Sequence, residues 1–150
     1  MPGSFTCVHY HIIFSTKYRE PTLRTDRFAH LFQYIGGILR QKGGKLVSAG
    51  GMPDHVHLLT AHGAQQALAD AVRDIKSNSS RWLREQFADE GGFAWREGYG
   101  AFAVSYSHLN RVKDYLARQA EHHQTRSFQE EFVAFLERHG IEYDDRYLWD

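Results

Sequence analysis

The stretch Met52-Pro53-Asp54-His55-Val56-His57-Leu58-Leu59 places two histidines one residue apart, between a turn signal and an apolar run. The apolar residues favour a β-strand, in which alternate side chains share a face. His55 and His57 would then point the same way, about 7 Å apart along the strand, with Val56 turned into the core. Two such imidazoles can converge on one metal ion, but ordinary sheet histidines show the same pattern. This stretch alone leaves both interpretations open.

The apolar pattern of the whole chain predicts two helices that each connect a pair of strands. The predicted strands cover residues 5–14, 45–49, the His-x-His segment, 93–95 and 101–105. The predicted helices cover residues 26–42, 67–87, 107–123 and 128–138. This order is that of the ferredoxin-like, or RRM-like, split βαβ sandwich. We therefore predict an α+β fold with a four-stranded antiparallel sheet and additional C-terminal helices.

In such a fold the two crossover helices cover one face of the sheet. The other face is free for ligands, nucleic acid or an added helix. We expect His55 and His57 on this second face.

Composition indicates one globular domain over residues 1–150, since a chain of this length can bury a core. No apolar run approaches the ~20 residues needed to span a membrane, and the N-terminus lacks a signal-peptide pattern. The single cysteine, Cys7, fits a reducing compartment. These features predict a cytoplasmic protein without a membrane partner.

Charge is distributed unevenly although the formal net charge is +0. Residues 1–53 carry seven lysines and arginines against two acids, a net of +5, and residues 127–150 carry two arginines against seven acids, a net of −5. A basic N-terminal third fits a phosphate-binding surface or an ordinary solvated one, and charge alone does not separate these interpretations.

The predicted helix over 107–123 carries Tyr115 and Gln119 four residues apart, so both lie on one face beside its buried stripe. Such a pair is common on helices. On its own it does not indicate a site.

Several segments together point to one family. They are Ile13-Phe14-Ser15-Thr16-Lys17-Tyr18-Arg19, Pro53-Asp54-His55-Val56-His57-Leu58-Leu59, Lys76-Ser77-Asn78-Ser79-Ser80-Arg81-Trp82, Trp95-Arg96-Glu97-Gly98-Tyr99-Gly100-Ala101-Phe102-Ala103-Val104-Ser105, Tyr115-Leu116-Ala117-Arg118-Gln119 with His122-His123, and Gly140-Ile141-Glu142-Tyr143-Asp144. The sequence resembles the single-tyrosine transposases of the HUH superfamily, enzymes of small insertion sequences (TnpA type), with the REP-associated tyrosine transposases as relatives. The histidine motif also occurs in replication initiators and relaxases. The Gly-Tyr-Gly-Ala-Phe segment followed by Tyr-x-x-x-Gln is more specific.

The resemblance implies a function and a site. His55, His57 and Gln119 would bind a divalent metal, Mg²⁺ or Mn²⁺, and Tyr115 would be the nucleophile. The enzyme would cleave and rejoin single-stranded DNA at hairpin-bearing element ends through a 5′-phosphotyrosine, without a nucleotide cofactor. It would act as a homodimer in which the tyrosine-bearing helix serves the partner's metal site.

Other residues are weaker candidates. We predict phosphate contacts from Lys17, Arg19, Arg24 and Lys76. His9 and His11 lie on the strand expected beside the His-x-His strand, where sheet packing or substrate contact is favoured over a fourth ligand. For His122 and His123 we favour contact with solvent or DNA phosphate over metal binding.

Two alternatives to a mobile-element transposase stay open. One is a domesticated relative that cuts repeat hairpins without moving its own element. The other is a non-catalytic module that binds single-stranded nucleic acid, as RRM domains do.

Overall fold

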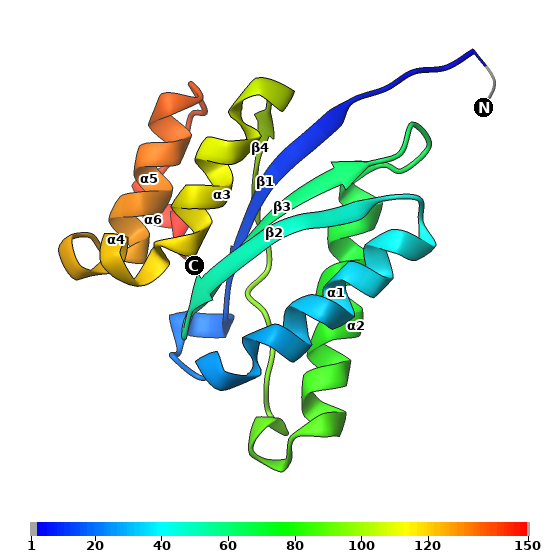
Figure 1. The fold of residues 1–150 in the computed structure, drawn as a ribbon. Coiled ribbons are helices and arrows are strands. Elements are labelled where there is room, and N and C mark those ends of the chain that lie inside the picture. Colours follow the sequence, from blue (N-terminus) through cyan, green and yellow to red (C-terminus); the bar gives the residue numbers. More distant parts are fainter. Residues whose placement is uncertain (1–2, 150) are drawn as a thin grey trace.

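The computed structural model describes residues 3–149 and is built on one four-stranded sheet (Figure 1). Its strands are β1 (Val8–Ser15), β2 (Lys45–Met52), β3 (His55–His62) and β4 (Gly100–Val104). They lie in the order β2-β3-β1-β4, and all neighbours are antiparallel. This confirms the predicted α+β fold with a four-stranded antiparallel sheet.

Helices α1 (Phe28–Gln41) and α2 (Leu68–Gln86) are the two crossovers and cover one face of the sheet. Alternate residues of β1 and β3, such as Ile12 and Val56, point into this layer because strand side chains alternate between faces. They pack there against the apolar stripes of both helices, which include Leu31, Ile35, Leu39, Val72, Ile75 and Leu83.

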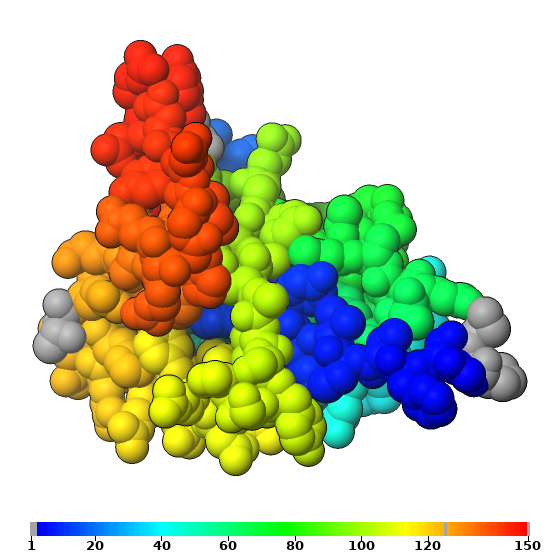
Figure 2. Space-filling view, turned by 90° about the horizontal axis from the view of Figure 1, so that it is seen from above, coloured from blue at the N-terminus to red at the C-terminus, as the bar shows by residue number. Residues whose placement is uncertain are grey.

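The opposite face is covered by C-terminal helices. These are α3 (Leu109–Ala117), α4 (Gln119–Thr125), α5 (Phe128–Arg138) and α6 (Asp145–Leu148). A second apolar cluster lies here and joins Ile13 and Phe102 of the sheet to Phe128, Phe132, Phe135 and Leu136 of α5. Figure 2 shows this C-terminal part, in yellow to red, as one flank of the molecule, with green α2 on the other. The sequence left this face open to ligands, nucleic acid or an added helix, and in the structure added helices cover it.

Short 3-10 turns complete the described elements, at Lys17–Arg19, Thr25–Arg27, Ala88–Glu90 and Tyr106–His108. None of the helices within residues 3–149 combines the length and the apolar character that crossing a membrane requires.

The predicted strand over residues 93–95 is wrong, because the structure has only an isolated bridge between Thr16 and Trp95 there. Two backbone hydrogen bonds form this bridge, from Lys17 N–H to the Ala94 carbonyl at 3.0 Å and from Arg96 N–H to the Ser15 carbonyl at 2.9 Å, and side chains hold the rest of the segment. The Trp95 indole donates to the buried Ser79 hydroxyl at 2.9 Å. Lys76 Nζ donates to the carbonyls of Arg96 and Gly98 at 2.6 and 2.8 Å, which occupies these backbone acceptors.

The single helix predicted over 107–123 is also corrected. The backbone leaves helical geometry at Arg118 (φ −108°, ψ 27°), so α3 ends at Ala117 and α4 begins at Gln119. The first strand begins at Val8 and not at Phe5, whose side chain is exposed. The remaining predicted elements lie within a few residues of the observed ones.

Candidate metal centre and nucleophile

His55 and His57 lie on the face of β3 that is covered by the C-terminal helices, and both side chains are fully buried. Their ring centroids are 5.1 Å apart. Val56 between them belongs to the core on the other side of the sheet. The structure therefore has both imidazoles on the shared face that the sequence pattern predicted.

Gln119 approaches His55 from the break between α3 and α4. Its side chain is buried, and its Oε1 lies 3.4 Å from His55 Nε2. This close approach requires a glycine on β2, because a Cβ at Gly50 would collide with the carbonyl of Leu116 and reach 3.5 Å from Gln119 Cγ. The predicted ligands His55, His57 and Gln119 thus lie together, while their role stays a prediction.

The second ring nitrogen of each histidine is already bound. His55 Nδ1 lies 2.6 Å from Asp54 Oδ1, and His57 Nδ1 shares a hydrogen bond of 2.7 Å with His11 Nε2. Metal-binding histidines are typically oriented in this way by a partner on the nitrogen that faces away from the metal. Burial alone would raise the pKa of Asp54, but the hydrogen bond and charge of His55, together with a backbone hydrogen bond and the charge of His123, lower that pKa. Asp54 is therefore an ionised acceptor for His55.

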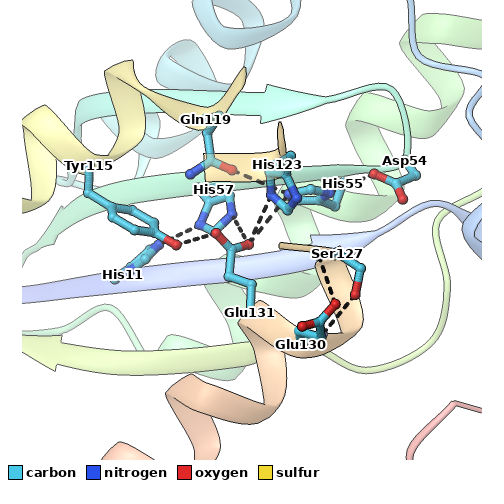
Figure 3. A network of polar contacts seen from close by, with 10 residues as sticks. All are labelled: His11, Asp54, His55, His57, Tyr115, Gln119, His123, Ser127, Glu130 and Glu131. Carbon is cyan, nitrogen blue, oxygen red and sulfur yellow. Dashed lines mark hydrogen bonds and ion pairs between the residues drawn. The ribbon is translucent and has the colours of Figure 1, made fainter. Parts of the chain in front are cut away.

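Two further residues complete a cluster that sequence analysis missed. Glu131 of α5 is fully buried, and its Oε1 lies 2.9 Å from His57 Nε2, 3.6 Å from His55 Nε2 and 3.4 Å from His123 Nε2 (Figure 3). We call His55, His57, His123 and Glu131 the histidine–glutamate cluster.

The sequence favoured a solvent or phosphate contact for His123, but its side chain is only 7% exposed and faces the cluster. For Glu131 a weak signal existed. It lies three residues after Phe128 and one before Phe132, within the buried stripe of an amphipathic helix. A carboxylate in such a position needs a partner.

Tyr115 lies beside the cluster and donates its hydroxyl hydrogen bond to Glu131 Oε2. Its ring stacks on His122, with centroids 4.2 Å apart, and meets the edge of His57 at 6.0 Å. Burial and the hydrogen bond to Glu131 raise the pKa of Tyr115 well above its usual value. Tyr115 is therefore protonated at neutral pH when the cluster holds no metal.

The pKa values of His57 and Glu131 are both lowered in the folded protein. Burial lowers the pKa of His57 to about 4, although Glu131 opposes this effect. Burial would raise the pKa of Glu131, but the hydrogen bond and charge of His57, with the hydrogen bond from Tyr115, lower it to about 2. Burial also places the pKa of His11 well below its usual value. At neutral pH His57 is thus a neutral imidazole and Glu131 a carboxylate, and both can bind a cation.

The residues present fit a divalent cation. One donor atom from each member of the cluster can be chosen so that all four lie within 4.8 Å of one another. For comparison, two donors on opposite sides of an ion at about 2.1 Å lie about 4.2 Å apart. Within residues 3–149, His123 Nε2 is buried without a hydrogen-bond partner and lies 3.4 Å from Glu131 Oε1. Imidazoles with carboxylate and amide oxygens suit transition metals such as Mn²⁺.

The four predicted DNA-contact residues have local partners outside this cluster. Lys76 binds backbone carbonyls, and burial lowers its pKa. Arg24 pairs with Asp26 at 3.0 Å. Arg19 lies over the Trp149 ring, and Lys17 over the Tyr18 ring. Their contacts with DNA stay predictions.

Comparison with known proteins gives consistent similarities. Residues 4–119 match the family described as transposase, IS200 like. The ISDra2 transposase TnpA of Deinococcus radiodurans is 31% identical over 119 residues, which is 75% of this chain and 84% of that protein. A crystal structure from Deinococcus radiodurans R1, assigned as a transposase, is 30% identical with a TM-score of 0.63 and covers 79% of this chain and 95% of its own.

A more distant structure shares the fold. It is a REP-associated tyrosine transposase bound to a REP hairpin, 13% identical with a TM-score of 0.61, and it covers 82% of this chain and 73% of its own. The family match ends at Gln119, so His123 and Glu131 lie beyond it.

Proposed function

Because the chain belongs to the family of IS200-like transposases, we propose that it cleaves and rejoins single-stranded DNA at hairpin-bearing ends of an insertion sequence. Tyr115 is the nucleophile in this proposal, and His55, His57 and Gln119 hold a divalent ion, Mg²⁺ or Mn²⁺. One observation carries it: the only tyrosine that contacts the histidine–glutamate cluster, among the residues the structure describes, is Tyr115.

The chemistry follows from these groups. The Tyr115 oxygen attacks phosphorus, a tyrosyl phosphoester bond forms, and the bond to the 3′ oxygen breaks. The tyrosine loses its hydroxyl proton, and the departing oxygen becomes a free 3′-hydroxyl. A divalent ion, when bound, would neutralise part of the negative charge on the phosphate. The phosphotyrosine conserves the energy of the broken bond, so a 3′-hydroxyl can reverse the step without ATP.

The two halves of the site come from different parts of the chain. The sheet supplies His55 and His57, while the junction of α3 and α4 supplies Tyr115 and Gln119. Burial around His57 excludes water from one side of the nucleophile. Such a dry site strengthens electrostatic interactions with a phosphate.

A homodimer with sites completed by the partner's helix is part of the proposal. In the structure of the single chain, Tyr115 lies beside His57 of the same chain, with ring centroids 6.0 Å apart. Mixing Tyr115→Phe with His57→Ala protein separates the arrangements. Cleavage by the mixture supports sites shared between subunits, and an inactive mixture supports sites within one chain.

The proposal is tested by incubating the protein with single-stranded candidate ends and Mg²⁺ or Mn²⁺, followed by a denaturing gel. We expect a covalent protein–DNA adduct with the wild type and none with Tyr115→Phe. If neither protein forms an adduct, the enzymatic proposal fails, and retained DNA binding would then support a binding module.

A further inference from the structure

We propose that Glu131 is itself a metal ligand and, through its second oxygen, the positioning residue of Tyr115. One carboxylate from α5 would thus link the nucleophile to the metal. This inference rests on the proposed function, because it assigns a role at the same site. It concerns a residue beyond the segment that matches the family, which ends at Gln119.

The two oxygens of Glu131 face different groups. Oε1 lies 2.9 Å from His57 Nε2, 3.4 Å from His123 Nε2 and 3.6 Å from His55 Nε2. Oε2 accepts the hydrogen bond of the Tyr115 hydroxyl. A carboxylate can bind a cation with one oxygen and accept a hydrogen bond with the other.

The partners of the two His55 ring nitrogens favour a cation beside Nε2. Its Nδ1 carries the proton that binds Asp54 at 2.6 Å, so neutral His55 has a bare lone pair on Nε2. That lone pair faces two oxygens, Gln119 Oε1 at 3.4 Å and Glu131 Oε1 at 3.6 Å. In this tautomer no hydrogen lies between Nε2 and the two oxygens, so a cation among the three atoms would be bound by all of them.

The position of Glu131 is fixed by the packing of its helix. A capping box begins α5: Glu130 N–H donates to Ser127 Oγ, and Ser127 N–H donates to Glu130 Oε1. Phe128 then stacks on His55 with centroids 4.4 Å apart. Helix α5 is therefore anchored directly against the histidine strand. A carboxylate held in this way is preorganised for its partners.

A purely structural role is the competing explanation, since a buried carboxylate needs hydrogen bonds in any case. The two roles differ in metal affinity. A structural Glu131 affects folding stability but not the intrinsic metal affinity of the folded protein. A ligand affects metal affinity directly.

The test is isothermal titration of metal-free protein with Mn²⁺. We compare wild type, Glu131→Gln and Glu130→Gln. The control is matched, because Glu130 is on the same helix, is exposed, and its replacement preserves the capping box. We expect Glu131→Gln to weaken Mn²⁺ binding at least about 10-fold, by comparison with losses seen for residues that support metal ligands. Glu130→Gln should stay within about 2-fold of wild type. Equal affinity of all three proteins overturns the inference.

A second readout separates positioning from folding. Cleavage by Glu131→Gln should be partly restored by raising the Mn²⁺ concentration, because the lost ligand lowers occupancy. A variant whose only defect is reduced stability is fully folded at a sufficiently low temperature. At that temperature, added metal should not increase its cleavage activity. At saturating Mn²⁺ we expect part of the cleavage defect to remain, because the substitution also changes the partner of the Tyr115 hydroxyl. Full restoration of cleavage at saturating Mn²⁺, with weakened binding, removes the positioning role of Glu131 but leaves its role as ligand.

A measurement on the wild type covers the case in which Glu131→Gln does not fold. Anomalous diffraction from crystals containing Mn²⁺ locates the ion directly. We expect it within about 2.5 Å of Glu131 Oε1, an ordinary distance for a carboxylate ligand. An ion held by His55, His57 and Gln119 with Glu131 turned away overturns the inference.

The outcomes also separate this inference from the proposed function. Wild type that binds Mn²⁺ and forms the DNA adduct, with unchanged affinity in Glu131→Gln, contradicts the inference alone. Weakened binding in Glu131→Gln without any adduct in wild type contradicts the proposed function alone. Wild type that binds no Mn²⁺ contradicts the inference and the metal requirement together.

Discussion

Tyr115 of α3 donates its hydroxyl hydrogen bond to Glu131 of α5, 16 residues later in the chain. The other oxygen of that carboxylate faces three histidines. The nucleophile of the proposed reaction and the candidate metal position are therefore joined by one side chain.

Removing the tyrosine hydroxyl should change stability as well as activity. In Tyr115→Phe, Glu131 Oε2 loses the hydrogen bond from Tyr115, and a buried acceptor without its partner costs about 1–3 kcal/mol. We expect the free energy of unfolding of the metal-free protein to fall by about this amount in urea. Tyr143→Phe is the control, because that hydroxyl donates to Glu137 at an exposed position. Equal losses in both variants would count against a special role of the Tyr115 contact.

The support of His55 by Asp54 should control metal affinity. Asp54→Ala removes the acceptor of His55 Nδ1, so the ring loses its fixed tautomer and orientation. We expect Mn²⁺ affinity to drop about 10- to 100-fold, as is usual for such partners of metal-binding histidines. Asp26→Ala, which removes an exposed partner of Arg24, is the control. Unchanged affinity in Asp54→Ala would contradict the assignment of His55 as a ligand.

The glycine below the helix junction should be required for the site. Gly50→Ala places a Cβ against the Leu116 carbonyl, so α3 must shift and carry Gln119 away from His55. We expect a loss of about 1–3 kcal/mol in stability and weaker Mn²⁺ binding. Gly37→Ala is the control, because it meets only the flexible end of Arg40 at 3.9 Å and lies within α1. Alanine should even stabilise that helix slightly. Normal Mn²⁺ affinity in Gly50→Ala would show that Gln119 is dispensable.

Acid should destabilise the metal-free protein. The folded pKa of His57 is about 4 against an ordinary value of 6.5, and that of Glu131 is about 2 against 4.5. Both folded values lie below the unfolded values, so the unfolded chain takes up protons first as the pH falls. The stabilising contribution of His57 is complete above about pH 6.5 and is lost toward pH 4, and that of Glu131 is lost between about pH 4.5 and 2.

We therefore expect the Tm of metal-free protein, measured by circular dichroism, to fall steadily from pH 7 to pH 4.5. The slope should be shallower in His57→Asn, which lacks the titrating group. A Tm that stays constant or rises on acidification in the wild type would contradict the buried, neutral state of His57.

Sequence periodicity was sufficient for the sheet and for half of the site. The period of two in a strand predicts that His55 and His57 share a face, and the structure has them there. Helical spacing likewise placed Tyr115 and Gln119 near each other. Despite the helix break at Arg118, both side chains reach the site, Tyr115 at Glu131 and Gln119 at His55.

Glu131 and His123 were beyond such reasoning. Their approach to the histidines depends on how α5 folds back across the sheet, which is decided by the packing of Phe128, Phe132 and Phe135 and not by local spacing. The strand predicted at residues 93–95 failed for a related reason. There, contacts of Trp95 with Ser79 and of Lys76 with backbone carbonyls override the local strand preference.

The most direct test of the central claim is to identify the residue that becomes attached to DNA. Wild-type protein is incubated with single-stranded candidate ends and Mn²⁺, digested, and analysed by mass spectrometry. The account predicts a nucleotide attached through its 5′-phosphate to the peptide that contains Tyr115. It also predicts that this adduct does not form when EDTA removes the metal. An adduct on another residue, or an adduct that forms equally well in EDTA, would contradict it.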